Sequence, residues 1–235
     1  MPDGVVPVPP DRIRPGQLGA VLLGRVIIGD IAATMVDLSV RGLLAVEERD
    51  GGQASWLLCA LASGRSAGTL LAYESTLLTA VSEAGGSATM QSLAPGMPNV
   101  LSRARDEILR DAVSNGWLHR LHRDQRTDAG EQLVLRIHRF QSELRKFVAD
   151  QGMDALADRL LPFALHFGIV ERDRLPLVQF AHGWVAAFGR TPGWYQPQPS
   201  RPSFDEPDAV AKPTIDEQMM DTNVGLGIWL TGWGT

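Results

Sequence analysis

The stretch GDIAATMVDLSVRG, residues 29–42, and the stretch LLAVEERDGGQASWLLCAL that follows it, residues 43–61, decide the fold. The first stretch predicts a helix that Asp30 caps and Gly42 ends. Its apolar side chains recur at helical spacing, at Ile31, Met35 and Leu38. One face of this helix is therefore expected to lie in the core.

The second stretch predicts a β-hairpin, because two apolar runs flank the Asp-Gly-Gly turn at 50–52. The runs are Leu43–Glu48 and Trp56–Leu61. A further short helix is expected ahead of them, over Gln17–Leu23. Two helices followed by a hairpin is the element order of a winged helix, so residues 17–62 are predicted to form a winged-helix-like unit.

A second winged-helix-like unit is predicted over residues 70–122, after a linker of small residues at 62–69. Its expected elements are a helix, a short element, a long helix and the start of a strand, at 74–81, 89–93, 99–114 and 117–118. We expect Asn99 to cap the long helix and Gly116 to end it. This order repeats the first unit coarsely, with a smaller wing.

From about residue 128 the chain is predicted to be fully helical. An uninterrupted apolar stripe marks the first helix of this part, at Leu133, Ile137, Phe140, Leu144 and Phe147. A second helix is expected over 154–167, where Pro162 predicts a kink or a break. A third begins near Pro176, a favoured first-turn position, and its apolar face holds Leu177, Phe180, Trp184 and Phe188.

Prolines concentrate at the two ends, with five in residues 2–15 and six in residues 192–213. Both ends should be extended or loose, because proline removes a backbone donor and disfavours helix in the residue before it. The predicted fold class is mainly α with small β-wings, as two tandem winged-helix-like units followed by a helical segment. The predicted parts are an extended N-terminal arm (1–16), unit 1 (17–62), unit 2 (70–122), a helical segment (128–195) and a proline-rich acidic tail with an apolar, Trp-containing end (196–235).

Six segments follow one another in a characteristic order. They are IAATMVDLSVRGLLAVEE (31–48), YESTLL (73–78), NGWL (115–118), HRFQSELRKF (138–147), LADRLLPFALHFGI (156–169) and PGWY (192–195). Through this succession most of residues 10–195 resembles the cytosolic region of the YciQ-like predicted membrane proteins of bacteria. The resemblance implies the same fold in a standalone module, without the extracytoplasmic domain and membrane helices that members usually carry. It implies no activity, because the family has none established.

Composition and charge bound the classes of function. The formal net charge is −5, so no overall basic field attracts nucleic acid or an anionic membrane. Cys59 is the only cysteine, which excludes an internal disulfide and a cysteine zinc site within one chain. The N-terminus lacks a secretory pattern. No apolar run approaches the roughly 20 residues of a spanning helix. We therefore expect no membrane insertion and a cytoplasmic protein.

The alternative prediction is that the protein is a winged-helix regulator that binds DNA. The long helix of the second unit carries Arg103, Arg105 and Arg110, which would face the DNA. Asp106 and Glu107 follow Arg103 at the spacing of ion pairs on a solvated helix. Specific DNA binders commonly neutralise about 6–10 phosphates, and this helix offers far fewer cations.

We predict no catalytic, metal or cofactor site. The sequence has no Gly-x-Ser-x-Gly elbow, no Walker loop and no strand–GxGxxG–helix unit. His119 and His122 supply two ligands, whereas zinc usually needs three or four from His, Cys or carboxylate groups. An enzyme whose site is assembled in space stays open as an alternative.

The aromatic side chains near the C-terminus are the candidate partner-binding residues, namely Trp194, Tyr195, Trp229 and Trp233. The tail can fold back onto its own domain or dock onto a partner, and both alternatives stay open. We predict a non-enzymatic protein- or peptide-binding accessory protein built on winged-helix modules. By analogy of fold alone, it would assist a partner enzyme, for example in the modification of a peptide natural product.

Overall fold

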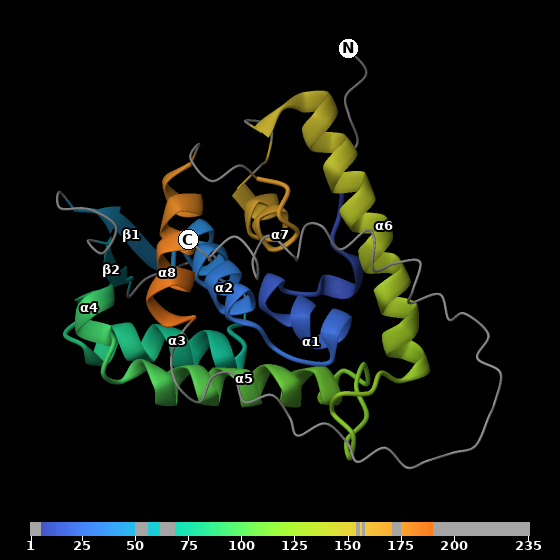
Figure 1. The fold of residues 1–235 in the computed structure, drawn as a ribbon, viewed down its shortest axis with the longest axis horizontal. Coiled ribbons are helices and arrows are strands. Elements are labelled where there is room, and N and C mark those ends of the chain that lie inside the picture. Colours follow the sequence, from blue (N-terminus) through green and yellow to red (C-terminus); the bar gives the residue numbers. More distant parts are fainter. Residues whose placement is uncertain are drawn as a thin grey trace.

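The fold is mainly helical with a small β part, as the sequence predicts, and its strands form one three-stranded antiparallel sheet (Figure 1). The computed structural model describes residues 6–49, 56–61, 69–153, 156, 158–170 and 175–189. The expected Asp-Gly-Gly turn and the whole tail lie outside these residues.

Helix α2 (Ile28–Val40) is the centre of the molecule, and every residue from Gly29 to Leu38 is buried. It packs against α7 (Leu161–His166), α8 (Pro176–Phe188) and the 3-10 turn η2 (Pro15–Gln17). The predicted stop at Gly42 is confirmed, since this residue takes φ +70° just after the helix.

The expected Asp30 cap is wrong in its position. Ile27 is the N-cap residue, in an extended conformation, and Asp30 is the third residue of the helix. The Asp30 carboxylate reaches back to accept a hydrogen bond of 2.7 Å from the Ile27 amide. It thus performs the acidic half of a capping box, although the N-cap side chain itself is apolar.

One sheet joins the two expected units. Strands β1 (Leu44–Glu48) and β2 (Trp56–Ala60) form the predicted hairpin, and β2 pairs on its other side with β3 (Ser87–Thr89). Strand β3 lies beyond the linker at 62–69, so the hairpin of the first expected unit pairs with a strand of the second expected unit. The division into two winged-helix-like units stays a prediction.

Helix α3 (Ala72–Glu83), the single turn α4 (Met90–Leu93) and α5 (Met97–Ser114) follow the expected order. The expected cap at Asn99 is wrong, because α5 begins two residues earlier. Pro98 occupies its first turn, where a missing backbone donor costs nothing, and Asn99 lies inside the helix. Helices α3 and α5 lie side by side along the lower edge of Figure 1.

Helix α6 (Asp128–Gln151) packs beside α1 (Leu18–Leu23) and forms the right-hand side of Figure 1. The predicted stripe is confirmed, with Phe147 half-buried and the other four side chains buried, Leu133, Ile137, Phe140 and Leu144.

The last part of the chain is less regular than predicted. In place of a helix over 154–167 there are a 3-10 turn, η4 (Asp158–Leu160), and α7, with Pro162 in the first turn of α7. Helix α8 follows, and its predicted buried face is confirmed at Phe180, Trp184 and Phe188. The region expected as an extended arm holds the turns η1 (Pro10–Arg12) and η2. None of the described helices is long and apolar enough to cross a membrane.

Gly130→Ala is expected to lower the free energy of unfolding by about 2 kcal/mol, because overpacking of rigid surroundings costs more than the helix gains. A Cβ at Gly130, in the first turn of α6, would lie 2.1 Å from the Trp117 carbonyl oxygen. The control is Gly29→Ala in the first turn of α2, where the nearest atom, on Ile27, is 3.6 Å away. Urea denaturation should show the control equal to or above the wild type. Equal losses in both variants would contradict the explanation.

Candidate functional site

A surface groove of about 420 Å³ runs between α3 and α5. Its lining is mostly small and polar, with three short apolar side chains between. The polar groups are Ser75, Thr76, Thr79 and Glu83 from α3, and Asn99, Arg103 and Glu107 from α5. Such a lining combines groups that can hydrogen-bond the backbone of an extended chain with a comparable amount of apolar surface.

Glu107 forms the floor of this groove and is 7 % exposed. One of its carboxylate oxygens accepts a hydrogen bond of 2.7 Å from the Thr76 hydroxyl. The other accepts a hydrogen bond of 3.0 Å from Arg103 Nε. Both oxygens are thus occupied, so Glu107 ties α3 to α5 and is not placed as a free acid or base.

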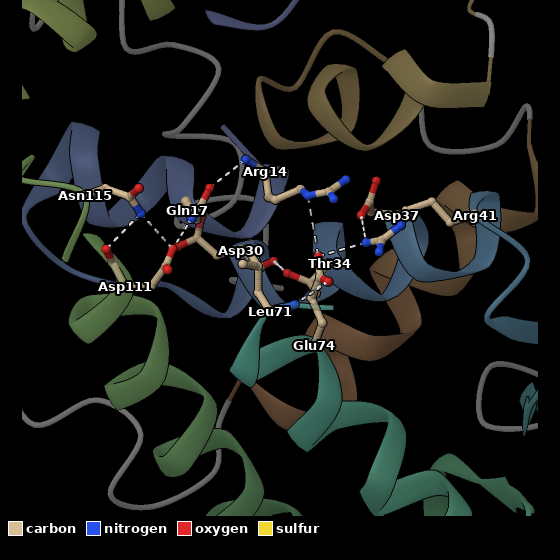
Figure 2. Close-up of polar contacts among 10 residues, drawn as sticks. All are labelled: Arg14, Gln17, Asp30, Thr34, Asp37, Arg41, Leu71, Glu74, Asp111 and Asn115. Atoms are coloured by element: carbon tan, nitrogen blue, oxygen red, sulfur yellow. Dashed lines mark hydrogen bonds and ion pairs between the residues drawn. The ribbon is translucent and has the colours of Figure 1, made fainter. Parts of the chain in front are cut away.

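The opposite face of α3 takes part in a buried polar network, shown in Figure 2. Glu74 is 0 % exposed, and its carboxylate accepts hydrogen bonds from Arg41 Nη1 at 2.8 Å and from the Leu71 amide at 3.0 Å. Arg41 also donates to Asp37 at 2.9 Å, and Arg14 Nε lies 3.9 Å from Glu74. These contacts join the end of α2 to the start of α3.

The network continues to α5 through Gln17. The side-chain carbonyl oxygen of Gln17 accepts a hydrogen bond of 2.6 Å from the backbone amide of Arg14. The side-chain NH₂ group of Gln17 donates to Asp111. Asn115 donates to the same Asp111 oxygen at 3.3 Å. Both helices that border the groove are therefore held from beneath by polar contacts, which keeps the groove in one shape.

Burial is the largest single influence on the shifted pKa values in this network. It raises the pKa of Asp37 although Arg41 opposes it, and it raises the pKa of Asp111 although the bond from Gln17 opposes it. Burial lowers the pKa of Arg41, but hydrogen bonds to Glu74 and Asp37 outweigh it and the pKa rises. Burial, and next the charge of Glu74, raise the pKa of Tyr73 well above its ordinary value.

Asp111→Asn is expected to stabilise the protein more at neutral pH than in mild acid, relative to the wild type. The raised pKa means that the native state keeps the Asp111 proton to a higher pH than the unfolded chain does. The contribution of this group to the free energy of unfolding therefore falls as pH rises from its unfolded to its folded pKa.

Urea denaturation at several pH values measures this trend for Asp111→Asn. Asp106→Asn on the outer side of the same helix controls for the loss of one negative charge. The prediction concerns the free energy of unfolding of Asp111→Asn minus that of the wild type. A difference that does not change with pH, or that falls toward neutral pH, would contradict it.

Asp30 and His166 form a second buried polar contact, between α2 and α7. Their side chains are 0 % and 1 % exposed, and Nδ1 of His166 lies 3.2 Å from an Asp30 oxygen. The Asp30 carboxylate also accepts hydrogen bonds from the Gly19 amide at 3.0 Å and from the Ile27 amide. Asp30 thus ties α1 to the start of α2 through hydrogen bonds, and His166 of α7 lies beside it without forming one.

The arginines expected to face DNA are largely engaged. Arg103 is 73 % exposed but paired with Glu107, and Arg105 lies 3.4 Å from Asp106. Arg110 is exposed and has no ion-pair partner among the residues that the structure describes. In the first unit, α2 is buried on all sides, so its Arg41 has no route to a DNA groove.

The loop 117–127, which we call the basic loop, is the other exposed basic region. It is closed by an antiparallel bridge between Leu118 and Arg126. His119, Arg120, His122 and Arg123 are all exposed. No group of three or more His, Cys, Asp or Glu side chains that could hold a metal ion occurs in the described part of the chain.

The four aromatic residues predicted to bind a partner, Trp194, Tyr195, Trp229 and Trp233, lie outside the described residues. The sequence analysis missed the groove and the network beneath it. A signal for part of the network was present, since Glu74 and Asp30 each stand three residues after the N-cap residue of a helix, which is the capping-box spacing.

No family model, curated protein or solved structure matches the chain. The resemblance to the YciQ-like family is untested and stays a prediction. The assignment of function therefore depends on the geometry of the groove and of the basic loop.

Proposed function

We propose that the chain is a non-enzymatic accessory protein that binds a protein or peptide partner in the groove between α3 and α5. The observation that carries this proposal is the groove itself, whose hydroxyl and amide groups from Thr79, Ser75 and Asn99 can hydrogen-bond an extended backbone. The exposed acid Glu83 favours a neutral or basic segment.

We propose further that α3, β3, α4, α5 and the basic loop make up a winged-helix unit. Their order of helix, strand, helix, helix and hairpin supports it, and β2 supplies β3 with a strand partner. The winged helix would then serve as a scaffold for the groove. A role beside an enzyme that modifies a peptide stays an analogy of fold.

DNA is the second candidate partner, and one observation favours it. Arg110, Arg120 and Arg123 are exposed without ion-pair partners in the described ranges, at the end of α5 and in the loop after it. Against it, Arg103 and Arg105 already have acidic partners, and few cations remain for phosphate contacts.

The test selects peptides from a displayed random library against the intact protein and measures their affinity for two variants. Thr79→Arg fills the groove, whereas Ser82→Arg places the same side chain on α3 outside it. We expect Thr79→Arg to weaken binding by at least about tenfold, and Ser82→Arg to leave it unchanged. Equal binding by both variants would exclude the groove. Binding of duplex DNA that weakens steeply with salt and is lost in Arg120→Ala/Arg123→Ala would favour the second candidate.

A further inference from the structure

The basic loop carries the most exposed large apolar side chain in the described part of the chain. Leu121 is 88 % exposed, ahead of Val8 at 76 % and Leu135 at 56 %. The exposed cations Arg120 and Arg123 stand on either side of it. The loop also holds the exposed acid Asp124, so Leu121 lies among two exposed arginines and one acid, with a net positive charge.

The backbone of the loop is braced by hydrogen bonds. Its backbone is closed by bonds of 2.9 Å from the His119 amide to the Gln125 carbonyl and from the Gln125 amide to the His122 carbonyl. Arg126 donates to the Leu22 carbonyl at 3.0 Å and so anchors the loop to the end of α1. A surface that is already ordered loses little conformational entropy when a partner binds.

We propose that the acidic C-terminal segment of this chain, residues 214–235, docks on the basic loop of the same molecule. We choose this segment as the partner of the loop because of its negative charge and its apolar side chains. The tail, 196–235, holds six of the chain's 27 acidic side chains and two of its 22 basic ones. Within 214–235 three acids precede an apolar end with two tryptophans, and no basic residue occurs.

The two surfaces match group by group. The acids of the segment, Asp216, Glu217 and Asp221, pair with Arg120 and Arg123. The third arginine of the loop, Arg126, already pairs with Glu131. The apolar end, IWLTGW at 228–233, covers Leu121, and a tryptophan ring beside an arginine adds a cation–π contact. Each contact is weak by itself at an exposed site.

Tethering makes a weak contact effective. The chain from 190 to 213 can span at most roughly 80 Å when extended, whereas α6, the longest helix, is about 36 Å long. The segment 214–235 can therefore reach the loop from the end of α8. A tether of this kind holds its end at an effective concentration near the millimolar range, so docking within one molecule prevails over docking between molecules.

The test uses the full chain with the photoreactive residue p-benzoylphenylalanine in place of Leu121. We expect crosslinks within one chain from position 121 into residues 214–235, mapped by mass spectrometry. The same probe at Leu135, on the outside of α6, is the matched control and should give none. Absence of crosslinks from 121 to the tail, or crosslinks only between two chains, would overturn the proposal.

Charge reversal separates docking from chance proximity. Arg120→Glu/Arg123→Glu should lower the yield of crosslinks from position 121 severalfold, and Arg145→Glu/Lys146→Glu on α6 should not. Raising the salt from about 50 to 500 mM should also lower the yield, because exposed charges are screened. Equal yields in both double variants would contradict the electrostatic contact.

The docking is independent of the α3–α5 groove. Thr79→Arg should weaken peptide binding by at least about tenfold and leave the crosslinks from position 121 unchanged. If a probe at Thr79 captures the tail and a probe at 121 does not, the tail is a ligand of the groove and the docking site on the basic loop is wrong. Either proposal can thus fail without the other.

Discussion

Glu74→Gln is expected to lower the free energy of unfolding by about 3 kcal/mol. This is the lower end of the range for breaking a buried ion pair, because Asp37 still partners Arg41 in the variant. Glutamine keeps the shape of the side chain but loses the charge. Its NH₂ group must then face either Arg41 or the Leu71 amide, and both are donors.

The control for Glu74→Gln is Glu143→Gln. Glu143 pairs with Arg139 on the exposed side of α6, where the two side chains are 48 % and 82 % exposed. Removing this surface pair should cost less than about 0.5 kcal/mol. Urea denaturation measures both variants under the same conditions. A loss in Glu74→Gln no larger than in Glu143→Gln would mean that the network adds nothing to stability.

Asp30→Asn is expected to cost a similar amount, about 3 kcal/mol. The carboxylate accepts from a buried amide, that of Gly19, and from the partly buried amide of Ile27, and His166 lies beside it. Asparagine can accept from one amide only, and it turns a donor toward the other. A buried donor left without a partner costs about 1–3 kcal/mol, and more where a charge is involved.

The control for Asp30→Asn is Asp128→Asn. Asp128 also stands in the first turn of a helix, α6, but its side chain is exposed. Only its favourable interaction with the helix dipole is lost, which is worth about 0.3–1 kcal/mol. Hydrogen exchange adds a second readout, since Asp30→Asn should raise the exchange of α7 and Asp128→Asn should not. Unchanged protection of α7 would show that His166 and Asp30 are not coupled.

Local patterns predicted most of the helices and the first hairpin. The stripe on α6 and the aromatic face of α8 were confirmed because apolar spacing in one segment determines which face a helix buries. The errors lie at helix starts. The predictions for Asp30 and Asn99 assumed a polar residue at the cap, whereas Ile27 and Gly96 occupy those positions. Cap identity depends on the backbone conformation just outside the helix, which a short motif does not specify.

The candidate site could not be predicted to the same degree. Charged residues in a sequence are expected to be exposed, so nothing marked Asp37 and Glu74 as buried or Arg41 as half-buried. Arg41 and Glu74 are 33 residues apart, and Gln17 and Asp111 are 94 residues apart. Their pairing follows from the packing of whole helices against one another. The groove has the same origin, because it exists only where α3 meets α5.

By itself the sequence determined that this protein is mainly helical, where its amphipathic helices run, and that acids stand at ion-pair spacing from the arginines of the long helix α5. These are properties of neighbours along the chain, set by periodicity and local charge. Only the tertiary structure decided that β3 joins β2, that α2 is buried on every side, and that α3 and α5 enclose a polar groove above a buried ionic network. Such features depend on contacts between distant segments, whose free energy is gained only when the whole core assembles.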